Sequence, residues 1–384
     1  MVRAAFDIGG TFTDFVLQGP DGTRTLKVPT SQPDPADAVL AGFQRLMEES
    51  GTSAEEIEVV LHGTTVATNA IIERKGAKTA LITTRGFRDI VLIGRQKRYE
   101  TYDLYMNKPL PLVRRRDIFE VDERMAFDGA VLLSLDGSSL SAIINKIVSG
   151  DYEAVAVALL HAYANPSHEW AVRDRITERM PDMLVSLSSD VSPKFREYER
   201  TSTTVANSYI KPAVTRYLGH LQGALGDQGF RNDLFIMQSN GGVLPARIAA
   251  RKPIFVIESG PAAGVVGAQR LGEKLDIPDC IVFDMGGTTA KIALVDEGEP
   301  HVDYHFEAAR EKRFAEGSGL PLNISAIKLI EIGAGGGSIA HIDDMDLLKV
   351  GPQSAGSEPG PVCYSRGGVD PTVTDADLLL GFLN

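Results

Sequence analysis

A twelve-residue pattern occurs twice in this chain and constrains its fold more than any other feature. Residues 6–17 read FDIGGTFTDFVL, and residues 283–294 read FDMGGTTAKIAL. In both copies an aspartate ends a hydrophobic strand, a Gly-Gly-Thr turn follows, and a second strand begins. Because both copies open an α/β segment, the repeat predicts a duplicated nucleotide-binding architecture in which two lobes face each other across a cleft.

Strand-like and helix-like segments alternate along most of the 384 residues, which is typical of an α/β protein with two to three domains. We place a domain boundary near residue 190, in the Ser-, Asp- and Pro-rich segment SLSSDVSPKF. The two lobes are then residues 1–190, with an insertion at about 85–135, and residues 191–384. The expected elements include helices at 35–50, 196–228 and 261–274, a hairpin at 118–135, a strand at 254–257, and a kink or boundary at Pro212.

The charge, the cysteine content and the length of the apolar runs disfavour several classes of protein. Lys and Arg number 39 against 51 Asp and Glu, so the net charge is −12, which disfavours nucleic acid and anionic membranes as partners. The two cysteines, Cys280 and Cys363, form no CxxC pair, which fits a reducing cytoplasm. No apolar run approaches the length of a membrane span. We therefore expect a cytoplasmic protein that acts on a small molecule.

The repeated turns are suited to phosphate. Glycines allow several backbone N–H groups to point into one concavity, and neighbouring hydroxyls can add donors. The aspartates at the strand ends can hold a hydrated Mg²⁺ or orient a reacting oxygen, as phosphoryl transfer requires. One such turn alone is more often an ordinary hairpin, and it is the duplication that favours phosphate binding. The residues concerned are Asp7, Gly9, Gly10, Thr11 and Thr13, and Asp284, Gly286, Gly287, Thr288 and Thr289.

A third glycine cluster follows a strand pattern, with Gly333, Gly335, Gly336 and Gly337 in IGAGGGSIA. It formally matches the dinucleotide fingerprint, but it lies late in the chain, behind two phosphate-loop candidates. We instead expect a strand-to-helix turn against which adenine and ribose lie, with a turn whose glycines serve only packing as the alternative. The sequence contains no Walker A, HExxH or GxSxG motif. His301-x-Asp303-x-His305 could bind a metal, although a solvated strand is the simpler interpretation.

These motifs resemble those of the hydantoinase A, 5-oxoprolinase and acetone carboxylase group, over nearly the whole chain and in matching order. The resemblance implies an actin-like, sugar-kinase-like ATPase fold of duplicated ribonuclease-H-like lobes, with the second lobe incomplete here. The segments that carry it are FDIGGTFTD (6–14), HGTTVATNAIIERKGAKTALITTRGFRD (62–89), ESGPAAGV (258–265), FDMGGTT (283–289), IGAGGGSIA (332–340) and VGPQSAGSEPGPVCYSRGG (350–368).

The resemblance also implies a chemistry in which ATP and Mg²⁺ phosphorylate an inert substrate oxygen. Our first hypothesis is the activating subunit of a cyclic-amide hydrolase of the hydantoinase/5-oxoprolinase type. The second is the equivalent subunit of an acetone- or acetophenone-type carboxylase, and the third is a non-catalytic, actin-like nucleotide switch. A hydantoinase B-like companion subunit, or a missing C-terminal region, is the expected partner in an oligomeric complex.

By carry-over from the family, the two Asp-Gly-Gly-Thr turns hold the phosphates and the third glycine cluster faces the adenosine. Further residues would line the cleft near the transferred phosphate, with helix capping and a tight turn as their alternative roles. Arg95 is a candidate contact for a substrate carboxylate or phosphate, because its guanidinium offers a bidentate fork. The cleft-lining candidates are Thr64, Thr65, Asn69, Glu258, Ser259 and Gly260.

Two features depart from the family pattern. Ala290-Lys291 replaces a Thr-Asp pair after the second turn, and Lys328 and Ile330 stand where an Asp and a His are common. The replacement at 291 is similar to the carboxylase branch without deciding for it. Only 100 residues follow Asp284, which leads us to expect a truncated or split polypeptide with an exposed apolar patch.

Overall fold

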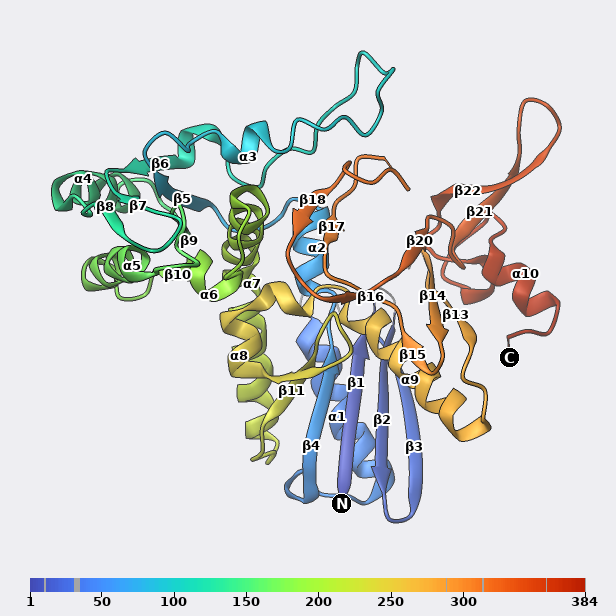
Figure 1. The fold of residues 1–384 in the computed structure, drawn as a ribbon. Helices are drawn as coiled ribbons and strands as arrows, with labels where there is room; N and C mark the ends of the chain where they lie inside the picture. Colours follow the sequence, from blue (N-terminus) through green and yellow to red (C-terminus); the bar gives the residue numbers. More distant parts are fainter. Residues whose placement is uncertain (10–11, 31–34, 288, 313, 357, 384) are drawn as a thin grey trace.

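The computed structural model describes the chain except for residues 10–11, 31–34, 288, 313, 357 and 384 and the side chains of 35–37. Figure 1 shows three sheet-centred parts that meet around the central strands. One part contains the first Asp-Gly-Gly-Thr turn, a second contains the other turn, and the third is an α/β unit at the left of the view. None of the described helices is long and apolar enough to cross a membrane.

The first turn belongs to a six-stranded sheet in which β1 pairs antiparallel with β2 and parallel with β4. Every second residue of β1 is buried, as expected for a strand with one face on a core. Strands from both sides of residue 190 join in this sheet. In spatial order they are β12 (Val243–Pro245), β11 (Leu234–Met237), β4 (Ile57–Gly63), β1 (Val2–Ile8), β2 (Phe12–Gly19) and β3 (Gly22–Pro29).

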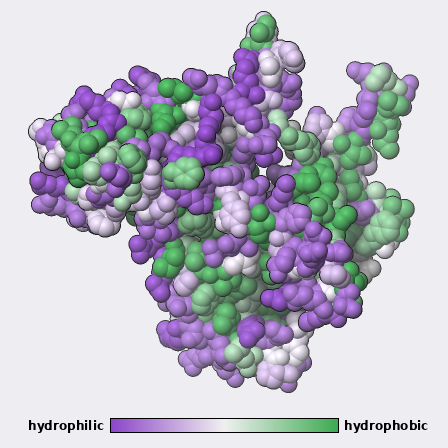
Figure 2. Space-filling view, viewed as in Figure 1, coloured by the Kyte–Doolittle hydropathy of each residue, from purple (hydrophilic) through white to green (hydrophobic). Residues whose placement is uncertain are grey.

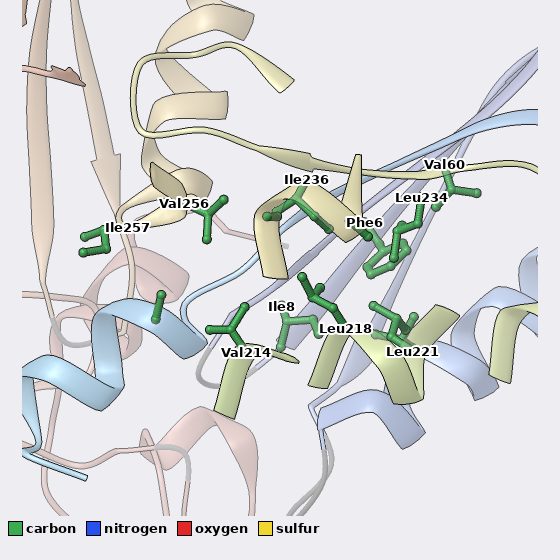
Figure 3. Packing of buried hydrophobic residues seen from close by; sticks show 14 of the residues in the cluster. Phe6, Ile8, Val60, Val214, Leu218, Leu221, Leu234, Ile236, Val256 and Ile257 are labelled. Atoms are coloured by element: carbon green, nitrogen blue, oxygen red, sulfur yellow. The ribbon is translucent and has the colours of Figure 1, made fainter. Parts of the chain in front are cut away.

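Helix α7 (Glu197–Asp227) supplies much of the core beneath this sheet. Figure 3 shows its Val214, Leu218 and Leu221 facing Phe6 and Ile8 of β1. The helix continues through Pro212, so the boundary expected there is wrong. The other helices packed around this core are α1 (Pro35–Ser50), α2 (Val66–Ile72), α8 (Ala246–Arg251) and the 3₁₀ helix η3 (Pro253–Val256).

The strand predicted at 254–257 is wrong. Pro253 starts η3, and Ile254, Val256 and Ile257 are buried in the main core. A short, continuous apolar run is compatible with burial in either a strand or a helix, and here it reflects burial alone.

A four-stranded parallel sheet forms the centre of the second α/β unit, in the spatial order β10 (Leu184–Leu187), β9 (Ala154–Ala158), β5 (Thr79–Thr84) and β6 (Ile118–Val121). The hairpin expected over 118–135 is smaller than predicted: β6 pairs with β5, and only β7 (Arg124–Met125) and β8 (Val131–Leu133) form the hairpin. The remaining elements of this unit are α3 (Ile90–Ile93), α4 (Gly137–Val148), α5 (Ser167–Arg179), α6 (Ser188–Val191) and η2 (Arg115–Asp117). The 3₁₀ helix η1 (Ala54–Glu56) belongs instead to the first sheet, directly before β4.

The second turn lies between β13 (Cys280–Met285) and β14 (Ala290–Asp296), which repeat the antiparallel pairing of β1 with β2. Their surroundings differ. Phe6 of β1 is 3% exposed, whereas Phe283 at the equivalent position of β13 is 59% exposed. The reason is that β1 has β4 on its other edge and Phe6 packs in the main core with residues of α7, whereas β13 pairs only with β14 among the described strands and Phe283 joins no core cluster.

Exposed apolar side chains gather on the C-terminal part of the chain, after β14. Figure 2 shows them around α10 (Val373–Leu379) and the base of the hairpin of β21 (Ser338–Ile342) and β22 (Leu348–Ser354). Leu379, at the end of α10, and Phe382 after it are well exposed. The apolar surface expected from the sequence is therefore present. The remaining elements are α9 (Ser259–Leu275), β15 (Glu299–Pro300), β16 (Val302–Asp303), β17 (Phe306–Ala308), β18 (Leu320–Leu322), β19 (Ala326–Ile327), β20 (Ile330–Ile332) and η4 (Val362–Tyr364).

Candidate active site

The two repeated turns are closed by the same backbone hydrogen bond. The Gly9 amide donates to the Phe12 carbonyl at 2.9 Å, and the Gly286 amide donates to the Thr289 carbonyl at the same distance. Both are hydrogen bonds from the third to the sixth residue of an Asp-x-Gly-Gly turn. The repeat found in the sequence is therefore also a repeat of structure. Gly10, Thr11 and Thr288, which we assigned to these turns, lie outside the described residues.

Thr13 supports the first turn from inside the fold. Its side chain is fully buried, and its Oγ1 lies 3.1 Å from Thr30 Oγ1. The Thr30 hydroxyl donates to the Gly9 carbonyl at 2.9 Å. This short chain of hydrogen bonds fixes the start of the turn from the neighbouring strand.

Asp7 occupies a cradle made by two glycines. A Cβ on Gly63 would lie 2.5 Å from Asp7 Oδ1, and a Cβ on Gly260 would lie 3.0 Å from the same atom. Only residues without side chains leave room for the carboxylate at this position. Gly63 ends the strand next to β1, and Gly260 lies in the first turn of α9, so elements far apart in sequence fix Asp7 together.

The electrostatic surroundings of Asp7 connect the two repeats. Its side chain is solvent-accessible, yet the protein removes enough hydration to raise its pKa, and Asp14 and Asp284 raise that pKa further, whereas Lys27 lowers it. Asp284, the corresponding residue of the second repeat, is therefore near enough for the two negative charges to interact. The fold therefore brings the two aspartates within electrostatic range of each other.

This excess of negative charge suits a bound cation. A divalent metal near Asp7 and Asp284 would relieve their mutual repulsion, and carboxylate oxygens held through water are typical Mg²⁺ ligands. Among the described residues no group of three or more His, Cys, Asp or Glu side chains could hold a metal by itself. That absence includes the His301, Asp303 and His305 motif. The donor set at Asp7 and Asp284 therefore fits a hydrated Mg²⁺ better than a fully protein-ligated ion.

Thr64 and Ser259 join the end of β4 to the start of α9. The Thr64 amide donates to Ser259 Oγ at 3.0 Å, and the Ser259 hydroxyl donates back to the Thr64 carbonyl at 3.0 Å. Both residues are buried. This reciprocal pair holds Gly63 and Gly260 on either side of Asp7, which is a positioning role.

Glu258 precedes α9 with φ of 57°, in the left-handed region that few residues other than glycine adopt. Its amide donates to Thr68 Oγ1 at 3.0 Å, and its carboxylate pairs with the Lys291 ammonium of β14. Lys291 therefore bridges the second repeat to α9. Across the strands Lys291 lies opposite Asp284, whereas the equivalent neighbour of Asp7 is Asp14, so the two repeats differ in charge.

Thr65 and Asn69 lie at the start of α2. Thr65 is the residue before the helix, and the Asn69 amide approaches Thr65 Oγ1 at 3.5 Å. Asn69 is exposed, whereas Thr64, with its hydrogen bond to Ser259, is buried. The Thr65 and Asn69 side chains remain available to a ligand.

The third glycine cluster packs directly on the second turn. The Gly336 amide donates to the Gly286 carbonyl at 2.9 Å, and the Gly337 amide donates to the Gly287 carbonyl at 2.7 Å. A Cβ on Gly336 would lie 2.5 Å from Thr374 Oγ1, so close packing already requires a glycine there. The segment from Gly333 leads into β21, and the expected strand-to-helix turn is therefore wrong. It is a strand-to-strand turn fixed against the phosphate-loop candidate.

A cleft of about 590 Å³ lies between the loop after α3, the start of α7, and the strands β16 to β18. Arg95 lines it, and its Nε lies 2.6 Å from Glu199 Oε1, an ion pair that raises the pKa of the guanidinium. Figure 1 shows the loop between α3 and η2 as an arm that extends away from the rest of the molecule. Residues between 91 and 109, within the segment where we expected an insertion, thus form one wall of a cavity large enough for a small substrate.

Comparison with known proteins now assigns the family. A model of the hydantoinase/oxoprolinase N-terminal region matches residues 3–180, and a hydantoinase/oxoprolinase model matches residues 200–384. The chain belongs to the hydantoinase/oxoprolinase family. It has the two-lobed, actin-like ATPase fold that the sequence predicted.

Three relatives illustrate the range of this family. An uncharacterized protein of Methanocaldococcus jannaschii is 41% identical over 99% of the chain and 57% of its own length. Caprolactamase subunit alpha of Pseudomonas jessenii is 36% identical over 99% of the chain and 54% of its own length. The nucleotide-free structure of acetone carboxylase superposes with a TM-score of 0.82 at 28% identity, covering 100% of this chain and 55% of that one. The chain spans about half the length of these relatives.

Gly63 is the residue of this family site that the sequence reasoning did not single out. It lies inside the HGTT motif that was used for the resemblance, yet a glycine at a strand end has many explanations. Its position beside β1 becomes visible only in the parallel pairing of Asp7 with Gly63. A pairing register between strands 56 residues apart is not encoded in any local pattern.

Proposed function

We propose that this chain is the ATP-dependent activating subunit of a cyclic-amide hydrolase, and that it phosphorylates the amide carbonyl oxygen before ring opening. The observation that carries the proposal is the relation of the two turns: Asp7 and Asp284 interact electrostatically, and each precedes a glycine turn closed by the same backbone hydrogen bond. Paired phosphate loops with facing aspartates suit a nucleotide bound between two lobes.

Phosphorylation is needed because an amide carbonyl carbon is a poor electrophile toward water. In the proposed reaction the carbonyl oxygen attacks the γ-phosphorus of ATP, the new O–P bond forms, and ADP leaves with the electrons of the broken P–O bond. Water then attacks the activated carbon, and the C–N bond of the tetrahedral intermediate breaks as the nitrogen takes up a proton, which opens the ring and leaves an acyl phosphate. A second water attacks the acyl carbon, and phosphate departs with the original carbonyl oxygen, leaving the carboxylate. Phosphate is a far better leaving group than hydroxide, so activation lowers the barrier to hydrolysis.

The residues of this chain would contribute binding and orientation. Asp7 and Asp284 would hold a hydrated Mg²⁺, which when bound neutralises phosphate charge. The backbone amides of the two turns, with the hydroxyls of Thr11, Thr288 and Thr289, would hold the phosphates, the buried Thr13 would support the first turn, and Gly333 to Gly337 would face the adenosine. Thr65, Asn69 and Glu258 would line the region of the transferred phosphate, and the buried Thr64 and Ser259 would hold the glycines beside Asp7. Water attack and ring opening would need a hydantoinase B-like companion subunit or a further part of the polypeptide.

The direct test is MgATP-dependent phosphate release by the purified protein, with any copurifying subunit retained. Hydantoin, 5-oxoproline and caprolactam are compared with acetone plus bicarbonate. Stimulation by a cyclic amide, lost in Asp7→Asn and in Asp284→Asn while the thermal unfolding transition persists, supports the proposal. Phosphate release that is unaffected by both substitutions contradicts the two-loop assignment.

A carboxylase subunit is the second candidate, and Lys291 favours it. This residue places a cation opposite Asp284, where the first repeat has an aspartate, and the acetone carboxylase structure superposes closely. Stimulation only by a ketone with bicarbonate would select this alternative. Nucleotide binding with no dependence of phosphate release on any small molecule would instead select the non-catalytic switch.

A further inference from the structure

We propose that the arm between α3 and η2, residues 94–114, joins two copies of this chain. The arms of the two copies pack side by side in opposite directions, so that the tip of each arm (101–106) lies against the base of the other (94–98 and 108–114). The inference does not depend on the reaction proposed above. It assigns a partner to a projecting segment whose exposed side chains the phosphate-loop site does not use.

The tip of the arm exposes three large side chains almost completely. Tyr102 is 96% exposed, Leu104 is 87% exposed and Tyr105 is 90% exposed. Figure 1 shows the arm extending away from the rest of the molecule, and Figure 2 shows apolar surface at the end of this projection. Single exposed apolar residues are ordinary, but three within four positions on a projecting loop indicate a contact with another protein molecule. Tyrosine in particular is enriched at such contacts.

The tip is held in shape by hydrogen bonds of its own. The Tyr105 amide donates to Asp103 Oδ1 at 2.9 Å, and the Tyr99 hydroxyl donates to the Asn107 carbonyl at 2.6 Å across the arm. The Arg98 guanidinium donates to the Asp103 carbonyl. These bonds exist before any partner binds, so association costs less conformational entropy than the ordering of a flexible loop would.

The base of the arm is fixed to the rest of the chain. Arg95 forms an ion pair with Glu199 of α7, and Arg74, directly after α2, donates to the Leu110 carbonyl at 2.7 Å. The two ends of the arm are therefore tied to two different helical segments. A fixed base and a fixed tip present the exposed side chains in one defined orientation, which a specific contact requires.

Charge is distributed unevenly along the arm, and this asymmetry favours a second copy as the partner. Lys97 and Lys108 lie at the base, where they line the cleft, whereas Asp103 lies at the tip. None of the three forms an ion pair within the described part of the chain, and two other charged residues of the arm are already paired with residues outside it. Six residues, at most about 20 Å of extended chain, separate Lys97 from Asp103.

Two arms that run in opposite directions bring Asp103 of each copy to the base cations of the other copy. Two arms in the same direction would instead place like charges together. A two-fold axis between the arms makes every such contact twice, because the same patch serves both copies. The arm is therefore complementary in charge to itself, and its exposed side chains can cover one another.

The size of the contact fits a weak but specific dimer. An aromatic side chain buries about 150–250 Å² when it is covered. Two tyrosines and Leu104 from each copy would therefore bury a total area on the order of 1,000 Å², which is the lower limit for a specific interface. Since Lys97 and Lys108 also line the cleft, the tip of the second copy would lie at the mouth of that cleft. Dimer formation would thus add to the cleft wall.

The test measures, by sedimentation velocity, the number of copies of this chain in each particle over a concentration series, with any copurifying subunit retained. We expect a dimer that dissociates on dilution and more readily at high salt, because exposed ion pairs are screened. Tyr102→Ser with Tyr105→Ser should raise the dimer dissociation constant at least about tenfold. Phe127→Ser, in the turn between β7 and β8, removes an aromatic side chain that is also exposed and should have no effect.

An exchange of charges tests the antiparallel arrangement. One variant carries Asp103→Lys, and the other carries Lys97→Glu with Lys108→Glu. Each variant alone brings like charges together, so its dissociation constant should rise at least about tenfold. An equimolar mixture restores both sets of opposite charges and should form a heterodimer about as tight as the parent dimer. This recovery also shows that both variants are folded.

Four results would overturn the proposal. They are a monomer at every concentration, a dimer that persists in the Tyr102→Ser and Tyr105→Ser variant, a mixture of charge variants that associates no better than either alone, and association only with a different subunit. Dimerisation that is lost instead in Leu379→Ser with Phe382→Ser would assign the contact to the apolar surface around α10, and this too would overturn it.

Discussion

Substitution of Gly63 by alanine should inactivate the protein without unfolding it. Gly63 ends β4 and does not adopt a positive φ, so its backbone tolerates a side chain. The added Cβ would lie 2.5 Å from Asp7 Oδ1, whereas ordinary contacts begin at 3.4 Å. The carboxylate must therefore move by about 0.9 Å, and a displacement of about 1 Å in a reacting group costs on the order of 100-fold in rate.

Two glycines of α9 extend this test to smaller displacements of the Asp7 carboxylate. A Cβ on Gly260 would lie 3.0 Å from Asp7 Oδ1, which requires a shift of only about 0.4 Å, so Gly260→Ala should lose activity by a smaller factor. A Cβ on Gly264, one turn further along α9, meets no atom within 4 Å. Gly264→Ala should retain full activity and gain up to about 1 kcal/mol of stability, because alanine favours the helix interior.

The assay is MgATP-dependent phosphate release with the substrate that stimulates it, and the unfolding temperature of each variant is measured in parallel. Loss of activity in the order Gly63→Ala, Gly260→Ala and Gly264→Ala, with unfolding temperatures close to that of the parent, supports a position-sensitive carboxylate. Full activity in Gly63→Ala, or a loss that follows stability instead of distance, refutes the reasoning.

Three further predictions concern charge. Loss of hydration and neighbouring carboxylates raise the pKa of Asp7 above its ordinary value, so Mg²⁺ affinity measured by calorimetry should increase as the pH rises through that pKa. The metal-free protein should lose stability over the same interval, since the folded state holds its proton more tightly than the unfolded state, and both trends should be absent in Asp7→Asn. Lys291→Met leaves the mostly buried Glu258 carboxylate unpaired and should cost about 1–3 kcal/mol in urea unfolding, while the double variant with Glu258→Gln should recover part of that loss. Burial lowers the pKa of His62 to about 3. The free energy of unfolding should therefore fall by about 1.4 kcal/mol for each pH unit as the pH is lowered from about 6.5 to about 3, because only the unfolded state binds a proton at this residue in that interval. The slope should be smaller in His62→Gln, and an unchanged slope would contradict this assignment.

The repeat shows how far sequence reasoning can reach. Phe6 and Phe283 occupy equivalent places in two nearly identical patterns, and both patterns form the predicted strand–turn–strand unit. Yet one phenylalanine is buried and the other is exposed. Local pattern determines the strand and its turn, whereas burial depends on which other elements pack against that strand, and this information lies elsewhere in the chain.

The candidate site likewise contains residues that a local sequence pattern predicts and residues that only the fold reveals. The aspartates and glycines of the two turns could be predicted because spacing alone indicates phosphate binding. The Asp7 cradle could not, because it depends on Gly63 and Gly260 approaching from β4 and α9. The cleft is harder still to predict, since its cations come from three separate segments of the chain and have no shared motif.

The central claim is that a substrate carbonyl oxygen receives the γ-phosphoryl group of ATP, and isotope transfer tests it most directly. A cyclic amide labelled with ¹⁸O at its carbonyl is turned over with MgATP by the purified protein with its copurifying subunits, and the released phosphate is examined by ³¹P NMR. Our account predicts one ¹⁸O atom in each phosphate formed with ring opening, because the C–O bond breaks after the O–P bond has formed. Ring opening with unlabelled phosphate would contradict the account.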